Sequence, residues 1–293
     1  MRLKGIFKEK SSASKLGILF LLIFVSFILH IIIATGLVYL FADNGLVLIQ
    51  QQDLSNQASV NYLKLMQLFT AVGIFITPTL LYAYLCNFDL KLRLNFSKQT
   101  LRQLLLAIAI MLLINPFISF LYEWNMSFNL PDWLMAYDLK AELLITSFMR
   151  MNSLPDLGFN LLVLAIVPAI GEELLFRGYL QQKFEKWLGK PQLAIIITAI
   201  LFSAIHLQFQ GFLPRFILGL VLGYFMYWSG SLWLPIIAHF CNNAMAVIFV
   251  YPALSDYAYL AENTATWQEA FFSFMAVGLL AFLLQKSINI KKG

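Results

Sequence analysis

The sequence predicts an all-α fold, a polytopic membrane bundle with about eight transmembrane helices. Of the 293 residues, 60% are hydrophobic and only 12% are charged, about half the charged share of a soluble domain. Eight apolar runs approach or exceed the length needed to cross about 30 Å of hydrocarbon. They do not alternate as barrel strands would, and a helix pairs each backbone amide within its own segment. Soluble, disordered, collagenous and disulfide-scaffold classes are therefore excluded.

The apolar runs give the expected helices in order. The first run follows a basic N-terminus, as a signal peptide would. At 27 residues it is too long for one and no clear cleavage site follows it, so we expect a retained helix. The runs at 191–207 and 213–229, with 17 residues each, are the shortest. The expected helices are 16–42, 62–86, 101–121, 157–180, 191–207, 213–229, 231–251 and 267–285.

Three regions follow from this order. Residues 1–156 hold the first three helices and an interfacial segment, residues 157–251 hold the four helices with polar motifs, and residues 252–293 hold the C-terminal helix. Aromatic residues and charges mix at 122–156, which suits an interfacial segment or a lid over the outer face. Gly219 and Gly223 have a small-xxx-small spacing, which predicts close helix packing.

Basic residues gather at alternate ends of the expected helices. Cytoplasmic loops are enriched in Lys and Arg, so this pattern predicts that both termini are cytoplasmic. The net charge of +5 and the pI near 9.1 then describe membrane orientation, and we expect the lipid bilayer, and no nucleic acid, as a partner. Sixteen of the 20 basic residues follow the pattern: Arg2, Lys4, Lys8, Lys10, Lys15, Lys91, Arg93, Lys98, Arg102, Arg177, Lys183, Lys186, Lys190, Lys286, Lys291 and Lys292.

Few ionisable side chains remain inside the apolar runs. An Asp, Lys or Arg at the centre of a membrane helix costs at least about 2.5 to 3.5 kcal/mol, so groups kept there are usually functional. Each group also has a structural interpretation, as a member of a buried ion pair or of an interhelical hydrogen bond. For the isolated His30 we expect this structural role. Polar groups on three helices instead favour a shared site. The ionisable residues concerned are His30, Glu172, Glu173, Arg177, His206 and His239.

Helical spacing assigns roles to these side chains. Glu173 and Arg177 share a helix face at i and i+4, where the two charges neutralise each other. Glu172 projects about 100° away without that counter-charge, which makes it the better general base. His239 and Asn243 also share a face and form a plausible oxyanion-stabilising pair.

Two further features concern the depth and shape of this site. Pro168 and Pro235 each precede a polar motif by four residues, so we expect kinks that open backbone carbonyls toward a cavity. At 1.5 Å per residue, Glu172 and His239 lie about 12 Å from the expected helix ends, and His206 lies about 22 Å from residue 191. Groups that act together should lie at the same depth in the membrane. Helix tilt or misplaced helix boundaries must therefore account for the difference in depth between His206 and the other two residues.

Three motifs occur in order on three expected helices: Glu-Glu-x-x-x-Arg from Glu172, Phe-x-x-x-His from Phe202, and His-x-x-x-Asn from His239. In this combination the chain resembles the CAAX protease and bacteriocin-processing (CPBP, also called Abi) family of intramembrane endopeptidases. The resemblance covers about residues 157–251. It implies hydrolysis of a peptide bond in a membrane-anchored or lipidated peptide substrate.

The resemblance also implies residue roles. Glu172 activates a water assisted by His206, and His239 with Asn243 stabilises the oxyanion. Glu173, Arg177 and Phe202 support the site structurally. Two other functions stay open: a non-catalytic membrane scaffold or bacteriocin immunity protein on the same fold, and a transporter, although no duplicated half is found.

Metal dependence also stays open. Glu172, His206 and His239 could ligate zinc and leave one open position, but the zincin His-Glu-x-x-His spacing is absent. A carboxylate and a histidine can also activate water directly. The sequence therefore predicts no certain cofactor, with zinc as the possible one.

Overall fold

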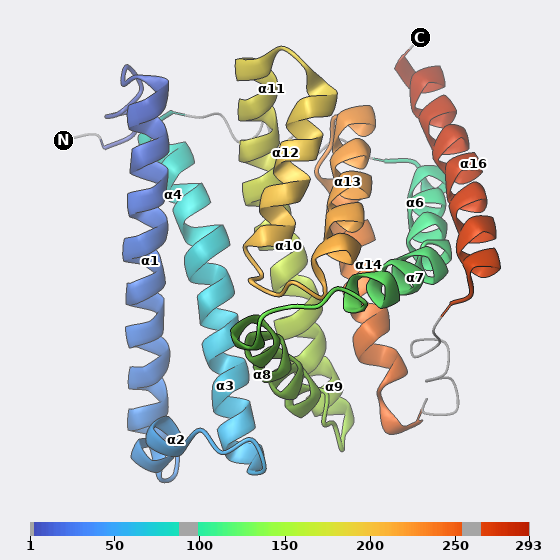
Figure 1. Cartoon of the computed structure of the whole chain (residues 1–293). Coiled ribbons are helices and arrows are strands. Elements are labelled where there is room, and N and C mark those ends of the chain that lie inside the picture. Colours follow the sequence, from blue (N-terminus) through green and yellow to red (C-terminus); the bar gives the residue numbers. More distant parts are fainter. Residues whose placement is uncertain (1–2, 88–98, 254–264, 293) are drawn as a thin grey trace.

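The structure is a computed structural model that describes residues 3–87, 99–253 and 265–292 (Figure 1). Every regular element in these ranges is a helix, which confirms the predicted all-α class. Arg2, Lys91, Arg93 and Lys98 lie outside the described residues. The α-helices are α1 (Ser12–Phe41), α2 (Gly45–Gln51), α3 (Gln57–Ala71), α4 (Thr77–Leu85), α6 (Leu101–Leu113), α7 (Asn115–Met126), α8 (Asp132–Phe148), α9 (Leu154–Asn160), α10 (Val167–Leu175), α11 (Gln182–Leu188), α12 (Pro191–Ala204), α13 (Phe212–Ser229), α14 (Trp233–Phe249) and α16 (Trp267–Lys292), and the π-helical segments are η1 (Val72–Ile76), η2 (Leu161–Ile166) and η3 (Phe176–Gln181).

Within the described ranges, six stretches of helix are long and apolar enough to span a membrane: α1, α3–α4, α6–α7, α9–α11, α13 and α16. The apolar helices α12 and α14 are shorter, with 14 and 17 residues. The run expected at 213–229 corresponds to α13, which has 18 residues and is one of the six. The protein is thus an integral multi-pass membrane protein, with α1 beginning and α16 ending at the same end of the bundle (Figure 1).

The fourth span is longer than the sequence predicts. Helix continues from Leu154 to Leu188, 35 residues in all, so the boundary expected at 180 is wrong. Glu172 therefore lies about 24 Å of helix from Leu188, which matches the roughly 22 Å from Pro191 to His206. This longer helix removes the difference in depth between Glu172 and His206. It also places Arg177 inside the bundle, wholly buried, and not at a basic helix end.

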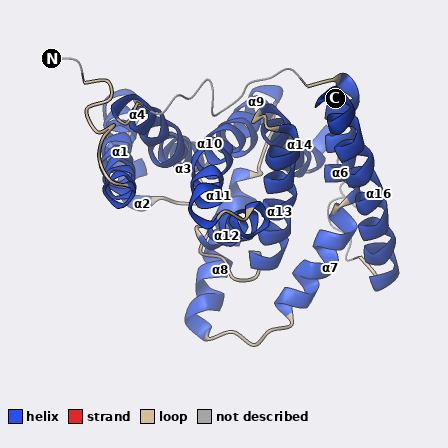
Figure 2. Cartoon of the chain, turned by 90° about the horizontal axis from the view of Figure 1, so that it is seen from above, coloured by secondary structure: helices blue, strands red, loops and turns tan. Residues whose placement is uncertain are grey.

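The third span bends where α6 meets α7. Pro116 has no N–H to donate to the carbonyl of Leu112, four residues earlier. The Asn115 side-chain amide donates to that carbonyl and to the carbonyl of Met111, both at 3.2 Å. After the bend, α7 leads into α8, and both extend to one side of α12 and α13 (Figure 2).

The outer helices face lipid and the inner helices pack closely. Only 11% of the most apolar window of α1 and 17% of that of α16 are buried, so these helices present apolar side chains outward. Inside, a Cβ added at Gly219 would lie 3.0 Å from the Ala199 backbone, and one at Gly223 would lie 2.8 Å from Ile195. This contact between α13 and α12 confirms the predicted packing role of the two glycines.

His30 links α1 to α4. Its Nδ1 lies 2.8 Å from the carbonyl oxygen of Ser26, and its Nε2 lies 3.3 Å from the hydroxyl of Thr77. A Cβ at Gly73 would approach the His30 Cβ to 3.0 Å, so the helices meet closely here. The expected structural role of His30 is confirmed.

Candidate active site

Glu172 and Glu173 lie on α10 between two π-helical segments, η2 and η3. Such segments are rare and are often found at functional sites. Glu173 has no exposed surface and Glu172 is 8% exposed, so the protein buries both carboxylates. Gly171 lets α10 approach η1, because a Cβ there would lie 2.9 Å from the Cβ of Phe75. Buried carboxylates this deep in apolar helices need partners.

Arg177 provides the counter-charge for Glu173. Its Nη1 lies 2.6 Å from Glu173 Oε1, and both side chains are wholly buried. Its Nη2 donates to the carbonyl of Gly219 on α13 at 3.0 Å, and its Cζ lies 4.7 Å from the centre of the Phe202 ring. One turn further on, Gln181 donates to the carbonyl of Gly223, also at 3.0 Å. The ion pair expected from the spacing is thus also the anchor of this helix on α13.

His239 meets both glutamates, a contact that the sequence does not predict. Its Nδ1 lies 2.9 Å from Glu173 Oε1, and its Nε2 lies 3.9 Å from Glu172 Oε2. A carboxylate accepts, so Nδ1 carries the proton and donates to Glu173. Glu173 therefore fixes the orientation of the His239 ring, and Nε2 faces the Glu172 carboxylate. The separation of 3.9 Å is too long for a direct hydrogen bond, and a small molecule beside both atoms could contact each of them.

Phe202 brings the three motifs together. Its ring stands edge-on to the rings of His206 and His239, with centroids 5.4 and 5.8 Å away. The His206 Nδ1 lies 2.9 Å from the Phe202 carbonyl oxygen, which can only accept, so Nδ1 is the donor and Nε2 is left as an acceptor. His206 is partly buried. Phe202 thus lies between the two histidines and Arg177, the position that a supporting residue needs.

Asn243 is held by the carbonyl of Leu164, to which Pro168, four residues later, cannot donate. The Asn243 Nδ2 donates to that carbonyl at 3.3 Å, and its Oδ1 accepts from Asn242 at 3.2 Å. Asn243 therefore joins α14 to η2, and its second amide hydrogen is the one available to a reacting group.

Asn243→Ala tests whether the Asn243 side chain stabilises the oxyanion or only joins α14 to η2. Loss of one oxyanion donor typically lowers kcat by about 10²- to 10³-fold, so we expect a comparable fall with residual activity. Asn242→Ala is the comparison variant, because Asn242 is also partly buried; its loss removes only a hydrogen bond to Asn243 Oδ1 and should lower the rate much less. Single-turnover rates of the two purified variants check this. Equal rates would assign Asn243 to helix packing alone.

Two buried residues outside the motifs hold the loop that follows His206. The Asp138 carboxylate on α8 accepts from the backbone N–H groups of Phe209 and Gln210 at 3.1 and 3.0 Å. The Asn125 Oδ1 on α7 accepts from the N–H of Leu213 at 3.1 Å. Both side chains are at most 5% exposed. No spacing in the sequence links them to His206, and they lie in the stretch 122–156, where other polar and charged residues give them no distinguishing signal.

Asp138→Ala should displace this loop, because two buried N–H groups lose their acceptor. A misplacement of about 1 Å can cost about 100-fold in rate, so we expect kcat/KM to fall by about 10- to 100-fold. The exposed Asp132 on the same helix provides the control variant, Asp132→Ala. Activity of Asp138→Ala equal to that of the control would show that the loop needs no such support.

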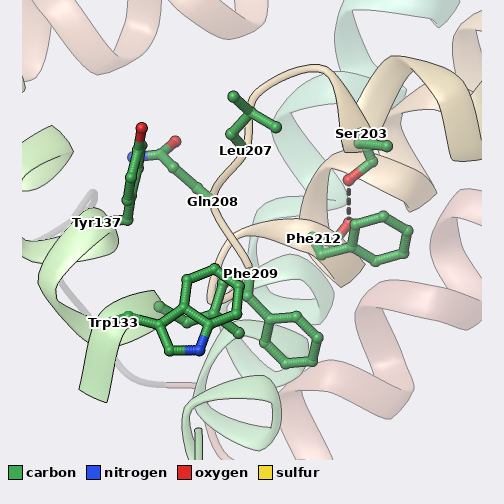
Figure 3. Close-up of a pocket in the computed structure, with 9 residues that line it drawn as sticks. Trp133, Tyr137, Ser203, Leu207, Gln208, Phe209 and Phe212 are labelled. Carbon is green, nitrogen blue, oxygen red and sulfur yellow. Dashed lines mark hydrogen bonds between the residues drawn. The ribbon is translucent and has the colours of Figure 1, made fainter. Parts of the chain in front are cut away.

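An apolar cavity of about 470 Å³ lies beside this loop (Figure 3). Trp133 and Tyr137 of α8 form one wall, and Ser203 of α12 and Phe212 of α13 lie across it. Its volume falls in the range of small-molecule sites, about 300 to 1,000 Å³. His206 does not line it, although residues on both sides of His206 do: Ser203, Ala204, Leu207, Gln208 and Phe209.

The proposed zinc ligands do not form a metal-binding group in the described part of the chain. Three or more His, Cys, Asp or Glu side chains close enough to hold a metal are not found there. Glu172 and His239 face each other, and the Phe202 ring stands edge-on to both His206 and His239. Zinc binding by Glu172, His206 and His239 stays a prediction.

Comparison with known proteins finds a family match over this part of the chain. Residues 155–245 match the model of type II CAAX prenyl endopeptidases, Rce1-like. The chain carries an Rce1-like domain of the CPBP family. The Rce1-like domain contains all three motifs, so the resemblance stated from the sequence is confirmed.

A curated relative shares part of the chain. An "Uncharacterized 24.3 kDa protein" from Escherichia coli is 32% identical over 123 residues, which cover 39% of this chain and 54% of that protein. The chain thus matches about half the length of this relative. No solved structure matches significantly.

Proposed function

We propose that this protein is an intramembrane endopeptidase that hydrolyses a peptide bond of a membrane-anchored or lipidated substrate. The Rce1-like domain supports a protease function. The observation that carries the proposal is the buried pair of facing atoms, Glu172 Oε2 and His239 Nε2, 3.9 Å apart within apolar helices. Packing alone does not account for a carboxylate that has no hydrogen-bond partner of its own among the described contacts.

The proposed reaction begins with water beside Glu172. The Glu172 carboxylate takes a proton from the water, assisted by the acceptor Nε2 of His206, as the water oxygen bonds to the scissile carbonyl carbon. His239 and the second amide hydrogen of Asn243 donate to the oxyanion that forms. In that role His239 carries both ring protons, and Glu173 supplies the counter-charge. The proton on Glu172 then passes to the departing amine as the C–N bond breaks.

The substrate side of the proposal rests on the membrane setting. The apolar cavity beside the loop suits an apolar portion of a membrane-associated peptide. Basic residues at the end of the bundle where α1 begins support a cytoplasmic location for both termini.

Membrane proteomics tests the function without a known substrate. Cells that express wild type or Glu172→Ala are compared for membrane proteins whose fragments appear only with wild type. Glu123→Ala, an exposed carboxylate change on α7, is the matched control and should give the wild-type fragments. A phenotype and fragment set unchanged by Glu172→Ala would instead favour a non-catalytic scaffold or immunity protein.

Metal content separates the two ways of activating water. Zinc held through His239 predicts stoichiometric metal in purified wild type and its loss in His239→Ala. Direct activation of water by Glu172 predicts full activity after chelation. Activity that disappears with the metal and returns with zinc would replace direct activation by Glu172.

A further inference from the structure

A second pocket, of about 320 Å³, lies at the end of the bundle where α1 begins. It is formed by the N-terminal segment, α1, the end of α4, η3 and α11. Four of its lining residues are lysines, and no acidic residue lines it. The lining residues are Lys8, Lys15, Tyr82, Cys86, Asn87, Tyr179, Gln182, Lys183 and Lys186.

Backbone hydrogen bonds fix the N-terminal segment that forms one wall. The N–H of Gly5 donates to the carbonyl of Tyr84, and the N–H of Phe7 donates to that of Leu85, both at 3.0 Å. The segment therefore docks on the end of α4 before α1 starts. This contact holds Lys8 beside residues that lie more than 70 positions away in sequence.

Specific contacts also hold two of the lysines. Lys15 donates to the carbonyl of Lys8. Lys183 on α11 donates to the hydroxyl of Ser12 at 3.1 Å, and its Nζ lies 5.0 Å from the centre of the Trp187 ring. Ammonium groups repel one another, so converging them costs free energy that a bound anion would offset.

The floor of the pocket is polar as well. The hydroxyls of Tyr82 and Tyr179 lie 3.0 Å apart at its buried side. The Gln182 amide already donates to the carbonyl of Arg177 at 3.3 Å, so the four ammonium groups are the main donors around this compact space. A phosphate group fits such a set, because its oxygens accept charge-assisted hydrogen bonds from several ammonium groups.

The position of the pocket indicates which kind of phosphate compound it would bind. It lies at the ends of membrane helices, at the level where lipid headgroups lie, and basic pockets there bind anionic headgroups. We propose that this pocket binds the phosphate of an anionic phospholipid headgroup and thereby ties the N-terminal segment and α1 to α11.

The enrichment of basic residues at cytoplasmic helix ends does not by itself explain why four lysines line one pocket. A positive helix end requires basic residues only somewhere in the flanking segments. Lys10 in the N-terminal segment and Lys190 after α11 satisfy that need equally well, yet neither lines the pocket. The four lining lysines come instead from three separate segments and meet in one place.

The experiment compares two double variants of the full-length protein. Lys8→Ala with Lys186→Ala removes two exposed lysines of the pocket. Lys10→Ala with Lys190→Ala removes two exposed lysines outside it, one in the N-terminal segment and one just after α11. The variants have equal net charge. Native mass spectrometry in detergent measures retention of added phosphatidylglycerol, with phosphatidylcholine and inorganic phosphate as the other probes.

We expect saturable binding of phosphatidylglycerol to wild type and to the control, and affinity lower by about 10-fold or more in the pocket variant. Equal losses in both variants would show a bulk charge effect and overturn the site. Displacement of the lipid by inorganic phosphate at low millimolar concentration would assign the pocket to free phosphate and overturn the lipid assignment. Equal retention of phosphatidylcholine would show that the charge of the headgroup is not recognised.

Discussion

Glu172→Gln should remove detectable proteolysis while the protein stays folded. The change keeps the volume and the hydrogen-bonding capacity of the side chain but removes the group that accepts the proton of water. General-base catalysis contributes about 10²- to 10⁴-fold, so we expect kcat to fall by at least about 100-fold. Turnover of a purified membrane substrate, together with thermal unfolding of the same sample, measures the two effects separately.

Glu123→Gln is the matched control, because Glu123 is an exposed glutamate on α7 outside the site. It should keep the wild-type rate. Turnover by folded Glu172→Gln at the rate of this control would remove Glu172 from the mechanism and leave the buried pair without its assigned chemistry.

The second large effect is on stability. Arg177→Ala and Glu173→Ala each leave a wholly buried charge without its partner, which typically costs about 3 to 5 kcal/mol. Each should therefore lower the free energy of unfolding by that amount, measured as denaturation in detergent. Gln181→Ala removes a hydrogen bond to the neighbouring carbonyl of α13 without uncovering a charge, and should cost only about 1 kcal/mol.

A double variant checks the reason for this loss. Glu173→Gln with Arg177→Met removes both charges of the pair together, so it should be more stable than either single alanine variant. Its activity should still be low, because the neutral amide holds His239 without the counter-charge. Single variants as stable as Gln181→Ala would refute the pairing of Glu173 with Arg177.

Local spacing predicts some of these contacts and cannot predict others. Residues at i and i+4 meet within one helix, which is why the pairing of Glu173 with Arg177 follows from the sequence. The contact of Glu173 with His239 joins residues 66 positions apart, and it depends on how α14 packs on α10. The sequence therefore predicts only a structural role for Glu173, whereas in the structure Glu173 also orients the His239 ring.

The sequence predicts the positions of the helices better than it predicts where each helix ends, for a physical reason. Hydropathy falls after residue 180, because Gln181, Gln182 and Lys183 follow, so the apolar run ends there. The helix continues to Leu188 because backbone pairing does not require apolar side chains. A polar extension beyond the hydrocarbon has no hydropathy signal. Likewise, nothing local links Asp138 to the loop after His206, since that contact spans 71 residues.

We propose that Glu172 activates the water that cleaves a membrane substrate. The most direct test uses purified protein in lipid nanodiscs, the substrate that proteomics identifies, and water labelled with ¹⁸O. We predict that wild type places ¹⁸O in the new carboxyl terminus of the product and that Glu172→Gln does so at least about 100-fold more slowly. Labelled product from Glu172→Gln at the wild-type rate would contradict the claim.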